Sequence, residues 1–219
     1  MNAVQSNITC WFIGLNVILS VAAAPLPTIA IAETSQSWAD ANVASLIELY
    51  RHFHTHPELS FQEEQTGERL ARELKETGAE VTTRVGGFGV VGLLRNGEGP
   101  TLMLRTDLDA LPVVEQTNLA YASTVKVQDA DGAEVGVMHA CGHDVHITNL
   151  VGVARYLAAN KDRWQGTVMF IGQPAEERGA GAAAMLEDGL FERFPKPDFA
   201  VAMHVDSGLA TGTLAYKGG

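Results

Sequence analysis

The residues with the clearest capacity for chemistry lie in one stretch, Met138–His146, just past the middle of the 219-residue chain. This stretch contains one of the two cysteines, three of the seven histidines and one aspartate. Thiolate, imidazole and carboxylate groups are the ligands that first-row transition metals prefer in proteins. The small residues Ala140 and Gly142 allow the backbone to bend, and an apolar helical pattern begins directly afterwards. The stretch is therefore predicted to form half of a metal site where a loop meets a helix.

Further acidic and imidazole side chains follow predicted strands elsewhere in the chain. Asp107 and Asp109 follow one strand, the pair Glu176 and Glu177 follows another, and His204 follows a third. The carboxyl ends of parallel strands meet at one rim of a sheet, which is where α/β proteins place their sites. Each feature is weak alone, because paired glutamates and lone histidines also occur for structural reasons. Their joint occurrence at successive strand ends favours one shared metal site.

The chemistry that this donor set supports is hydrolysis. Cys141 and His143 can coordinate one or two ions, joined by a carboxylate of the glutamate pair and by His204. A bound ion lowers the pKa of its water from about 15.7 towards about 7, which produces hydroxide near neutral pH. A neighbouring glutamate that is not a ligand can take the proton of that water and pass it to a leaving amine. Two adjacent glutamates can divide these two roles.

Apolar periodicity predicts the elements that position these groups. Helices are predicted over residues 38–53, 63–77, 147–157 and 181–192, and strands over residues 81–85, 90–94, 101–106, 166–172, 199–203 and 211–216. Strand, loop and helix repeat along the chain, which predicts an α/β fold: a three-layer sandwich with a mostly parallel central sheet. Residues 115–136 are polar and contain glycine, so we expect a surface loop there.

Composition and the N-terminal segment limit the possible partners and the cellular location of the protein. The formal net charge of −11 argues against nucleic acid or an anionic membrane surface as the main partner. Residues 1–32 contain no Asp, Glu, Lys or Arg, have an apolar run, and end in Ala30-Ile31-Ala32, which is typical of a signal peptide. We therefore expect an exported protein, periplasmic or secreted, that leaves the membrane after cleavage. The alternative is a retained membrane anchor, which is less favoured because the apolar run is shorter than the roughly 20 residues that a spanning helix needs. Cleavage removes Cys10, so Cys141 is then a spare thiol or a ligand.

Two other patterns do not predict sites. His52, His54 and His56 are spaced by two residues, so a helix does not place them on one face. We interpret them as the polar end of the first helix, leading into a turn. Residues 87–92 match the Gly-x-Gly-x-x-Gly pattern of dinucleotide sites, but no helix starts at the last glycine, so we predict a hairpin.

Four segments resemble, in order, those of the M20 metallopeptidase family. They are His56–Leu59 (HPEL), Arg105–Pro112 (RTDLDALP), Met138–Asp144 (MHACGHD) and Gln173–Glu177 (QPAEE). The resemblance covers about residues 40–219 and is greatest to the amidohydrolase branch, which contains hydrolases of N-acyl amino acids, hippurate and auxin conjugates. It implies a zinc-exopeptidase-like catalytic domain and a metal-dependent hydrolase of amide bonds in such small molecules.

The resemblance also implies a role for each candidate residue. Four residues become metal ligands: Cys141, His143, Glu177 and His204. Glu176 becomes the general base and Asp107 a supporting residue that orients a ligand, whereas His139 and His146 are expected to be structural. The family implies two divalent metal ions, and zinc, manganese and cobalt all suit mixed thiolate, imidazole and carboxylate ligation. The expected partner is a small N-acyl amino acid or amide conjugate, with homo-oligomerisation left open.

The chain departs from the family pattern at its C-terminal end. Family members carry a lid or dimerisation domain after the region that matches residues 211–219, and the catalytic fold then resumes and supplies a last histidine ligand. We therefore expect a truncated product in which residues 38–219 are the N-terminal part of the catalytic domain and the lid is absent. The alternative hypothesis is an inactive fragment that keeps partial metal binding without catalysis.

Overall fold

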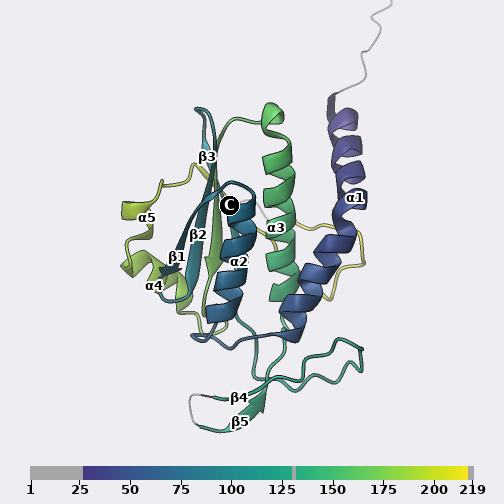
Figure 1. The fold of residues 1–219 in the computed structure, drawn as a ribbon, viewed down its shortest axis with the longest axis vertical. Coiled ribbons are helices and arrows are strands. Elements are labelled where there is room, and N and C mark those ends of the chain that lie inside the picture. The colour runs from purple at the N-terminus through teal and green to yellow at the C-terminus, as the bar shows by residue number, and fades with distance from the viewer. Residues whose placement is uncertain (1–26, 130–131, 217–219) are drawn as a thin grey trace, which may run out of the picture.

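A five-stranded sheet forms the centre of the computed structural model, which describes residues 27–129 and 132–216. The strands are β1 (Glu80–Val85), β2 (Gly89–Asn96), β3 (Thr101–Asp107), β6 (Gly166–Gln173) and β7 (Phe199–Ala202), in the order β1-β2-β6-β3-β7 (Figure 1). Pairing is antiparallel between β1 and β2 and between β2 and β6, and parallel between β6 and β3 and between β3 and β7. Four strands therefore run the same way and β2 runs against them, which confirms the predicted mostly parallel sheet.

Helices cover both faces of the sheet (Figure 1). One face carries α1 (Pro27–Thr55), α2 (Glu64–Glu76) and α3 (His143–Ala159), and the short 3₁₀ turn Lys161–Arg163 follows α3. The other face carries α4 (Gly181–Glu187) and α5 (Leu190–Arg193). The predicted three-layer α/β sandwich is confirmed.

The two central strands alternate between these layers. In β2, Val90 and Leu94 pack against α1, α2 and α3, whereas Val91 and Leu93 pack towards α4 and α5. The side chains of β6 alternate in the same way. Strands buried on both faces read as continuous apolar runs, which is why the sequence shows no polar alternation here. Burial of a side chain such as Leu94, which is fully buried, stabilises the fold by about 1.5–3 kcal/mol.

The C-terminal strands differ from the prediction. The segment 199–203 does form a strand, β7, but all four of its residues are exposed, so it is not a core strand. It pairs with β3 on one side only and forms the edge of the described sheet. The predicted strand at 211–216 is wrong, because these residues form a turn and irregular backbone in which Leu214 is 88% exposed. A strand needs a hydrogen-bonded neighbour, and apolar alternation cannot supply one.

Three other elements differ in detail. The helix predicted over residues 181–192 is interrupted at Gly189, whose φ of 81° breaks it into α4 and α5. The expected loop 115–136 contains a small antiparallel hairpin, β4 (Lys126–Gln128) with β5 (Glu134–Gly136). Helix α3 begins at His143 rather than at Ile147, so its first turn lies inside the metal-binding stretch.

The predicted signal peptide falls mostly outside the described residues. Of its 32 residues, those numbered 1–26 are not described, and residues 27–32 belong to the start of α1. Within the described part of the chain, no helix has the length and apolarity needed to cross a membrane.

Candidate metal centre

The turn that begins α3 depends on Gly142. This residue precedes the helix with a left-handed φ of 79°, a conformation that glycine adopts without the steric cost of a side chain. A Cβ at this position would lie 2.5 Å from Cγ2 of Val205, the residue after His204. The small residue therefore allows the turn and also allows the C-terminal segment to approach it.

The imidazole of His143 is held with one nitrogen available. Its Nδ1 lies 2.8 Å from the backbone oxygen of Asp109, so the Nδ1–H donates a hydrogen bond to that carbonyl. This bond leaves Nε2 as the lone-pair nitrogen, and Nε2 is buried with no hydrogen-bond partner among the described residues. The same nitrogen lies 3.8 Å from a carboxylate oxygen of Glu176 and 3.8 Å from one of Glu177. His143 is therefore oriented as metal ligands commonly are, by a hydrogen bond from the far side of the ring.

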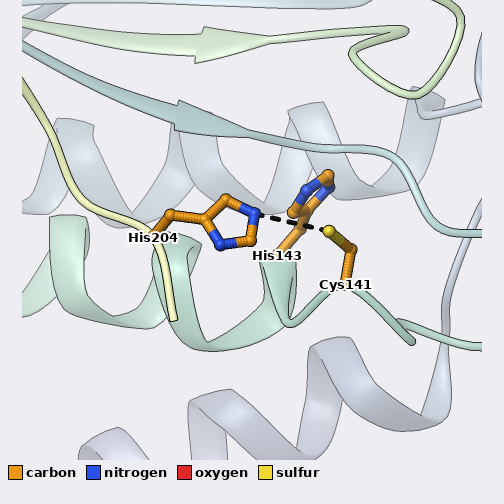
Figure 2. A group of neighbouring side chains, drawn as sticks. All are labelled: Cys141, His143 and His204. Atoms are coloured by element: carbon orange, nitrogen blue, oxygen red, sulfur yellow. Dashed lines mark hydrogen bonds between the residues drawn. The ribbon is translucent and has the colours of Figure 1, made fainter. Parts of the chain in front are cut away.

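Cys141 and His204 complete a second group around His143. The sulfur of Cys141 lies 3.3 Å from Nε2 of His204, and the three side chains point towards one another in Figure 2. Burial, together with the nearby carboxylates of Glu177, Glu176 and Asp107, raises the pKa of the Cys141 thiol to about 11. A cation among these groups would reverse that effect, because it stabilises both the thiolate and the carboxylates.

The glutamate pair follows β6 in a turn that is tied to Asp109. The backbone N–H of Glu177 donates to Oδ2 of Asp109 over 3.0 Å, and the hydroxyl of Ser60 donates to the same oxygen over 2.6 Å. Asp109 is fully buried, and although burial raises its pKa, the adjacent His143 ring and hydrogen bonds from Ser60 and the Glu177 amide outweigh burial and lower it. Its carboxylate therefore stays ionised and links the turn of Glu177 to the ring of His143.

Asp107, which was predicted to orient a ligand, lies close to the site. It is buried, and its carboxylate forms an ion pair with Arg105. One of its carboxylate oxygens lies within 4.8 Å of a ring nitrogen of His143 and of one of His146. However, the hydrogen bond that orients His143 is accepted by the backbone carbonyl of Asp109. The role of Asp107 stays a prediction. Asp109, a second residue of the same motif, has a contact with His143 that the sequence pattern does not predict.

His146 lies nearer to the cluster than its predicted structural role implies. Its ring centroid is 4.4 Å from that of His204, and its Nε2 accepts a hydrogen bond of 2.9 Å from the backbone N–H of Val205. Burial and the neighbouring His204 and His143 lower its pKa to about 4, so the ring is neutral and can accept this bond. His146 therefore holds the segment that carries His204. Its spacing of three from His143 in one helix is the sequence signal that indicates their proximity.

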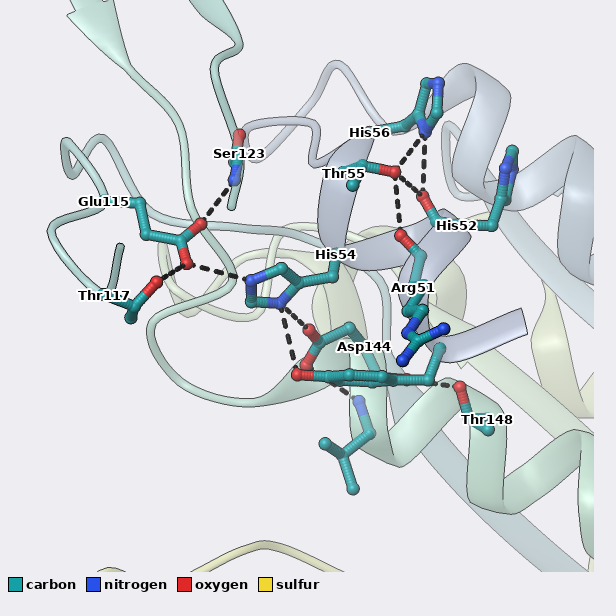
Figure 3. A network of polar contacts seen from close by, with 12 residues as sticks. Arg51, His52, His54, Thr55, His56, Glu115, Thr117, Ser123, Asp144 and Thr148 are labelled. Atoms are coloured by element: carbon teal, nitrogen blue, oxygen red, sulfur yellow. Dashed lines mark hydrogen bonds and ion pairs between the residues drawn. The ribbon is translucent and has the colours of Figure 1, made fainter. Parts of the chain in front are cut away.

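Two further histidines, His139 and His54, are also buried. His139 is 4% exposed, and burial lowers its pKa to about 3. His54, at the end of α1, lies between two carboxylates: its Nδ1 is 2.7 Å from Asp144 and its Nε2 is 3.1 Å from Glu115 (Figure 3). Burial lowers the pKa of His54, but the hydrogen bonds to Asp144 and Glu115 outweigh burial and raise it. The resulting network fixes the first turn of α3, because Asp144 directly follows His143.

The donor set fits a divalent metal ion. Three overlapping groups place their ligand atoms within 4.8 Å of one another: Cys141, His143 and His204; His143, Glu176 and Glu177; and Asp107, His143 and His146. Ligand atoms about 2.1 Å from one ion lie at most about 4.2 Å apart, and the 3.8 Å between His143 Nε2 and a Glu177 oxygen meets this limit. That Glu177 oxygen is also buried without a hydrogen-bond partner in the described part of the chain. His143 belongs to all three groups and is the centre of the arrangement.

A cavity opens beside Glu177. Its volume is about 620 Å³, and apolar side chains of Leu59, Phe61, Leu111 and Pro112 line it together with Glu177. Polar residues also line it: Ser60, Gln62, Asp129 and Arg178. A cavity that combines apolar walls with polar groups is typical of a small-molecule site.

Comparison with known proteins agrees with the geometry. Residues 103–219 match the profile of Peptidase family M20/M25/M40. The chain belongs to this family. Among curated M20 relatives, an N-acetyl-L-cysteine deacetylase of Bacillus subtilis is 39% identical over 175 residues, which is 80% of this chain and 39% of the relative. A hippurate hydrolase of Campylobacter jejuni is 45% identical over 159 residues, or 72% of this chain and 38% of the relative.

A solved M20 structure is similar in fold. It is the YXEP protein of Bacillus subtilis, described as a dinuclear metal binding peptidase, with 39% identity and a TM-score of 0.72. The match covers 82% of this chain and 48% of that protein. The chain thus spans less than half the length of each of these M20 relatives.

Proposed function

We propose that this chain forms the metal-binding part of a hydrolase that cleaves the amide bond of N-acyl amino acids or related small conjugates. The observation that supports this most directly is the buried pair of atoms, Nε2 of His143 and an oxygen of Glu177, neither of which has a hydrogen-bond partner among the described residues. Burial of unpaired polar atoms destabilises a fold unless a ligand satisfies them.

The proposed ligands are the four residues that converge on this point. They are Cys141, His143, Glu177 and His204. Two divalent ions bound there would supply Lewis-acid activation of water. Zinc, manganese and cobalt all accept thiolate, imidazole and carboxylate ligands, so the donor set is compatible with each of them.

Glu176 is the proposed general base. Its side chain is 38% exposed, against 20% for Glu177, and one of its oxygens lies 3.8 Å from His143 Nε2. The more accessible carboxylate can take a proton from an attacking water and return it to the leaving amine. Asp109 keeps the turn in place meanwhile, because it accepts the Glu177 amide.

The proposed substrates follow from the relatives and from the cavity. The relatives are named for N-acetyl-L-cysteine and for hippurate, both of which are N-acyl amino acids. The apolar wall formed by Leu59, Phe61 and Leu111 can accept an acyl or aromatic group next to Glu177.

Hydrolysis by the purified chain tests this function. N-acetylcysteine and hippurate are incubated with the chain in the presence of Zn²⁺, Mn²⁺ or Co²⁺, and release of the amino acid is measured. The proposal expects turnover that a chelator abolishes and added metal restores. Turnover that persists in chelator would contradict it.

Metal binding without hydrolysis is the second candidate function. The observation that favours it is the exposure of β7 and of His204, because an exposed ligand in the irregular segment after an edge strand is held less firmly than a buried one. Metal bound in stoichiometric amount with no turnover of either substrate would favour this second candidate.

Export to the periplasm or the exterior is a further part of the proposal. It rests on the uncharged residues 1–32 and their Ala-Ile-Ala ending. The acidic charge of −11 supports a small molecule as the partner, rather than nucleic acid.

A further inference from the structure

The turn that presents the two glutamates contains a residue in an unfavourable conformation. Ala175, directly before Glu176, is fully buried and has a φ of 46°, in the left-handed region that residues with a side chain rarely adopt. Such a backbone persists only where its surroundings hold it, and such residues gather at functional sites. Something in the structure must therefore hold Ala175.

A buried carboxylate from a distant part of the chain contacts this residue. Glu63, which directly precedes α2, is fully buried, and its Oε1 accepts the backbone N–H of Ala175 over 2.7 Å. Its other oxygen has no hydrogen-bond partner among the described residues. Burial of a carboxylate is costly, and an apolar side chain would fill the same space without that cost. The free-energy cost of burying Glu63 is explained if its hydrogen bond to Ala175 is needed to hold the turn that carries Glu176 and Glu177.

Two carboxylates thus bind the backbone of the turn over residues 175–177, which carries Glu176 and Glu177. Glu63 accepts the N–H of Ala175, and Asp109 accepts the N–H of Glu177 two residues later. The segment that carries Glu63 is also anchored, because Ser60 donates to Asp109 and Glu58 accepts the N–H of Thr66 over 2.7 Å in the first turn of α2. Glu176 lies between the two held amides.

We propose that Glu63 is a positioning residue that holds the Ala175 amide and thereby sets the direction of the Glu176 and Glu177 carboxylates. The inference rests on the proposed function for the roles of those two glutamates. Glu63 does not touch the site itself, so it acts through the turn. What it contributes is a hydrogen-bond acceptor at one place, and glutamine can supply the same acceptor.

Metal titration of three variants of the 219-residue chain tests the proposal. E63A removes the acceptor, E63Q keeps an acceptor oxygen in the same place, and E73A is the matched control. Glu73 is also a buried carboxylate of the α2 region, but it pairs with Arg69 and Arg155 and belongs to none of the ligand groups. The binding of Mn²⁺ and Zn²⁺ is measured by calorimetry under conditions in which circular dichroism shows each variant folded.

The proposal expects E63A to weaken metal binding by about 10- to 100-fold, the range found when a partner of a ligand is removed. E63Q should stay within about threefold of the wild type, and so should E73A, although E73A also loses stability. Equal affinity in E63A and the wild type would overturn the proposal. So would a loss in E73A as large as that in E63A, or a failure of E63Q to restore binding.

Hydrogen exchange of the Ala175 amide gives a test that needs no variant. In the metal-free wild type, the proposal expects this amide to exchange at least about 100-fold more slowly than an unprotected one, because it is bound to a buried acceptor. Rapid exchange would overturn the proposal even if E63A fails to fold. Absence of metal binding by the wild type would instead contradict the proposed function, and the exchange measurement would still test the hydrogen bond between the Ala175 amide and Glu63.

Discussion

Gly142→Ala is the substitution whose effect on the site is set most clearly by the structure. A residue with a side chain in the left-handed conformation of Gly142 costs about 1–2 kcal/mol of unfolding free energy. The new Cβ would also lie 2.5 Å from Cγ2 of Val205, so the Val205 side chain has to move. Val205 follows His204 and is bound through its N–H to His146, so the displacement reaches a proposed ligand. We expect Gly142→Ala to lower metal affinity by about tenfold or more.

Two further variants separate strain from displacement. Gly78 has a φ of 84° with nothing within 4 Å of an added Cβ, so Gly78→Ala should cost a similar free energy of unfolding and leave metal affinity unchanged. The double variant Gly142→Ala/Val205→Ala removes the contacted atom and should recover most of the affinity but not the stability. Urea unfolding and metal titration of the purified variants give both quantities. Wild-type metal affinity in Gly142→Ala, or an equal loss of affinity in Gly78→Ala, would show that the contact with Val205 does not affect the metal site.

Three more predictions concern the buried network of His54, Glu176 as the general base, and cleavage of the signal peptide. Because the folded state raises the pKa of His54, the protonated ring stabilises the folded state fully below pH 6.5. This stabilisation is lost as the pH rises through the raised pKa. Urea unfolding of His54→Gln should therefore show a deficit of about 3 kcal/mol at pH 6 that shrinks towards pH 9, and a deficit independent of pH would contradict the ion pairs with Asp144 and Glu115. Glu176→Gln should abolish hydrolysis while elemental analysis finds the metal content unchanged; a parallel loss of metal would make Glu176 a ligand. Mass spectrometry of the exported protein should find Glu33 at its N-terminus, and an intact leader in the exported fraction would count against cleavage.

The fold could be predicted where burial alone determines the pattern. The continuous apolar runs of β2 and β6 identify strands buried on both faces, and α2 shows the spacing of a helix with one buried side. The exposure of β7 and the absence of a strand over residues 211–216 could not be predicted in this way. Both depend on whether a neighbouring strand is present to pair, and local sequence does not carry that information.

The site likewise has a part that local sequence predicts and a part that it does not. Cys141 and His143 could be found because ligands and small residues lie together in one short motif. The contacts that hold them in place join residues far apart in the chain, such as Glu63 with Ala175 or His54 with Asp144. A lone buried acid or histidine has no distinctive local pattern. Hence the sequence predicts only a polar helix end at His54, whereas the structure places this residue in a buried network.

The proposed site requires that Cys141 binds a metal ion together with His143, Glu177 and His204. Titration of the purified chain with Co²⁺, followed by absorption spectroscopy, tests it most directly, because a thiolate bound to cobalt gives a charge-transfer band that other ligands do not. This band should grow until the site is saturated, and it should be absent in Cys141→Ser. Saturation with no such band in the wild type, or an unchanged band in Cys141→Ser, would contradict it.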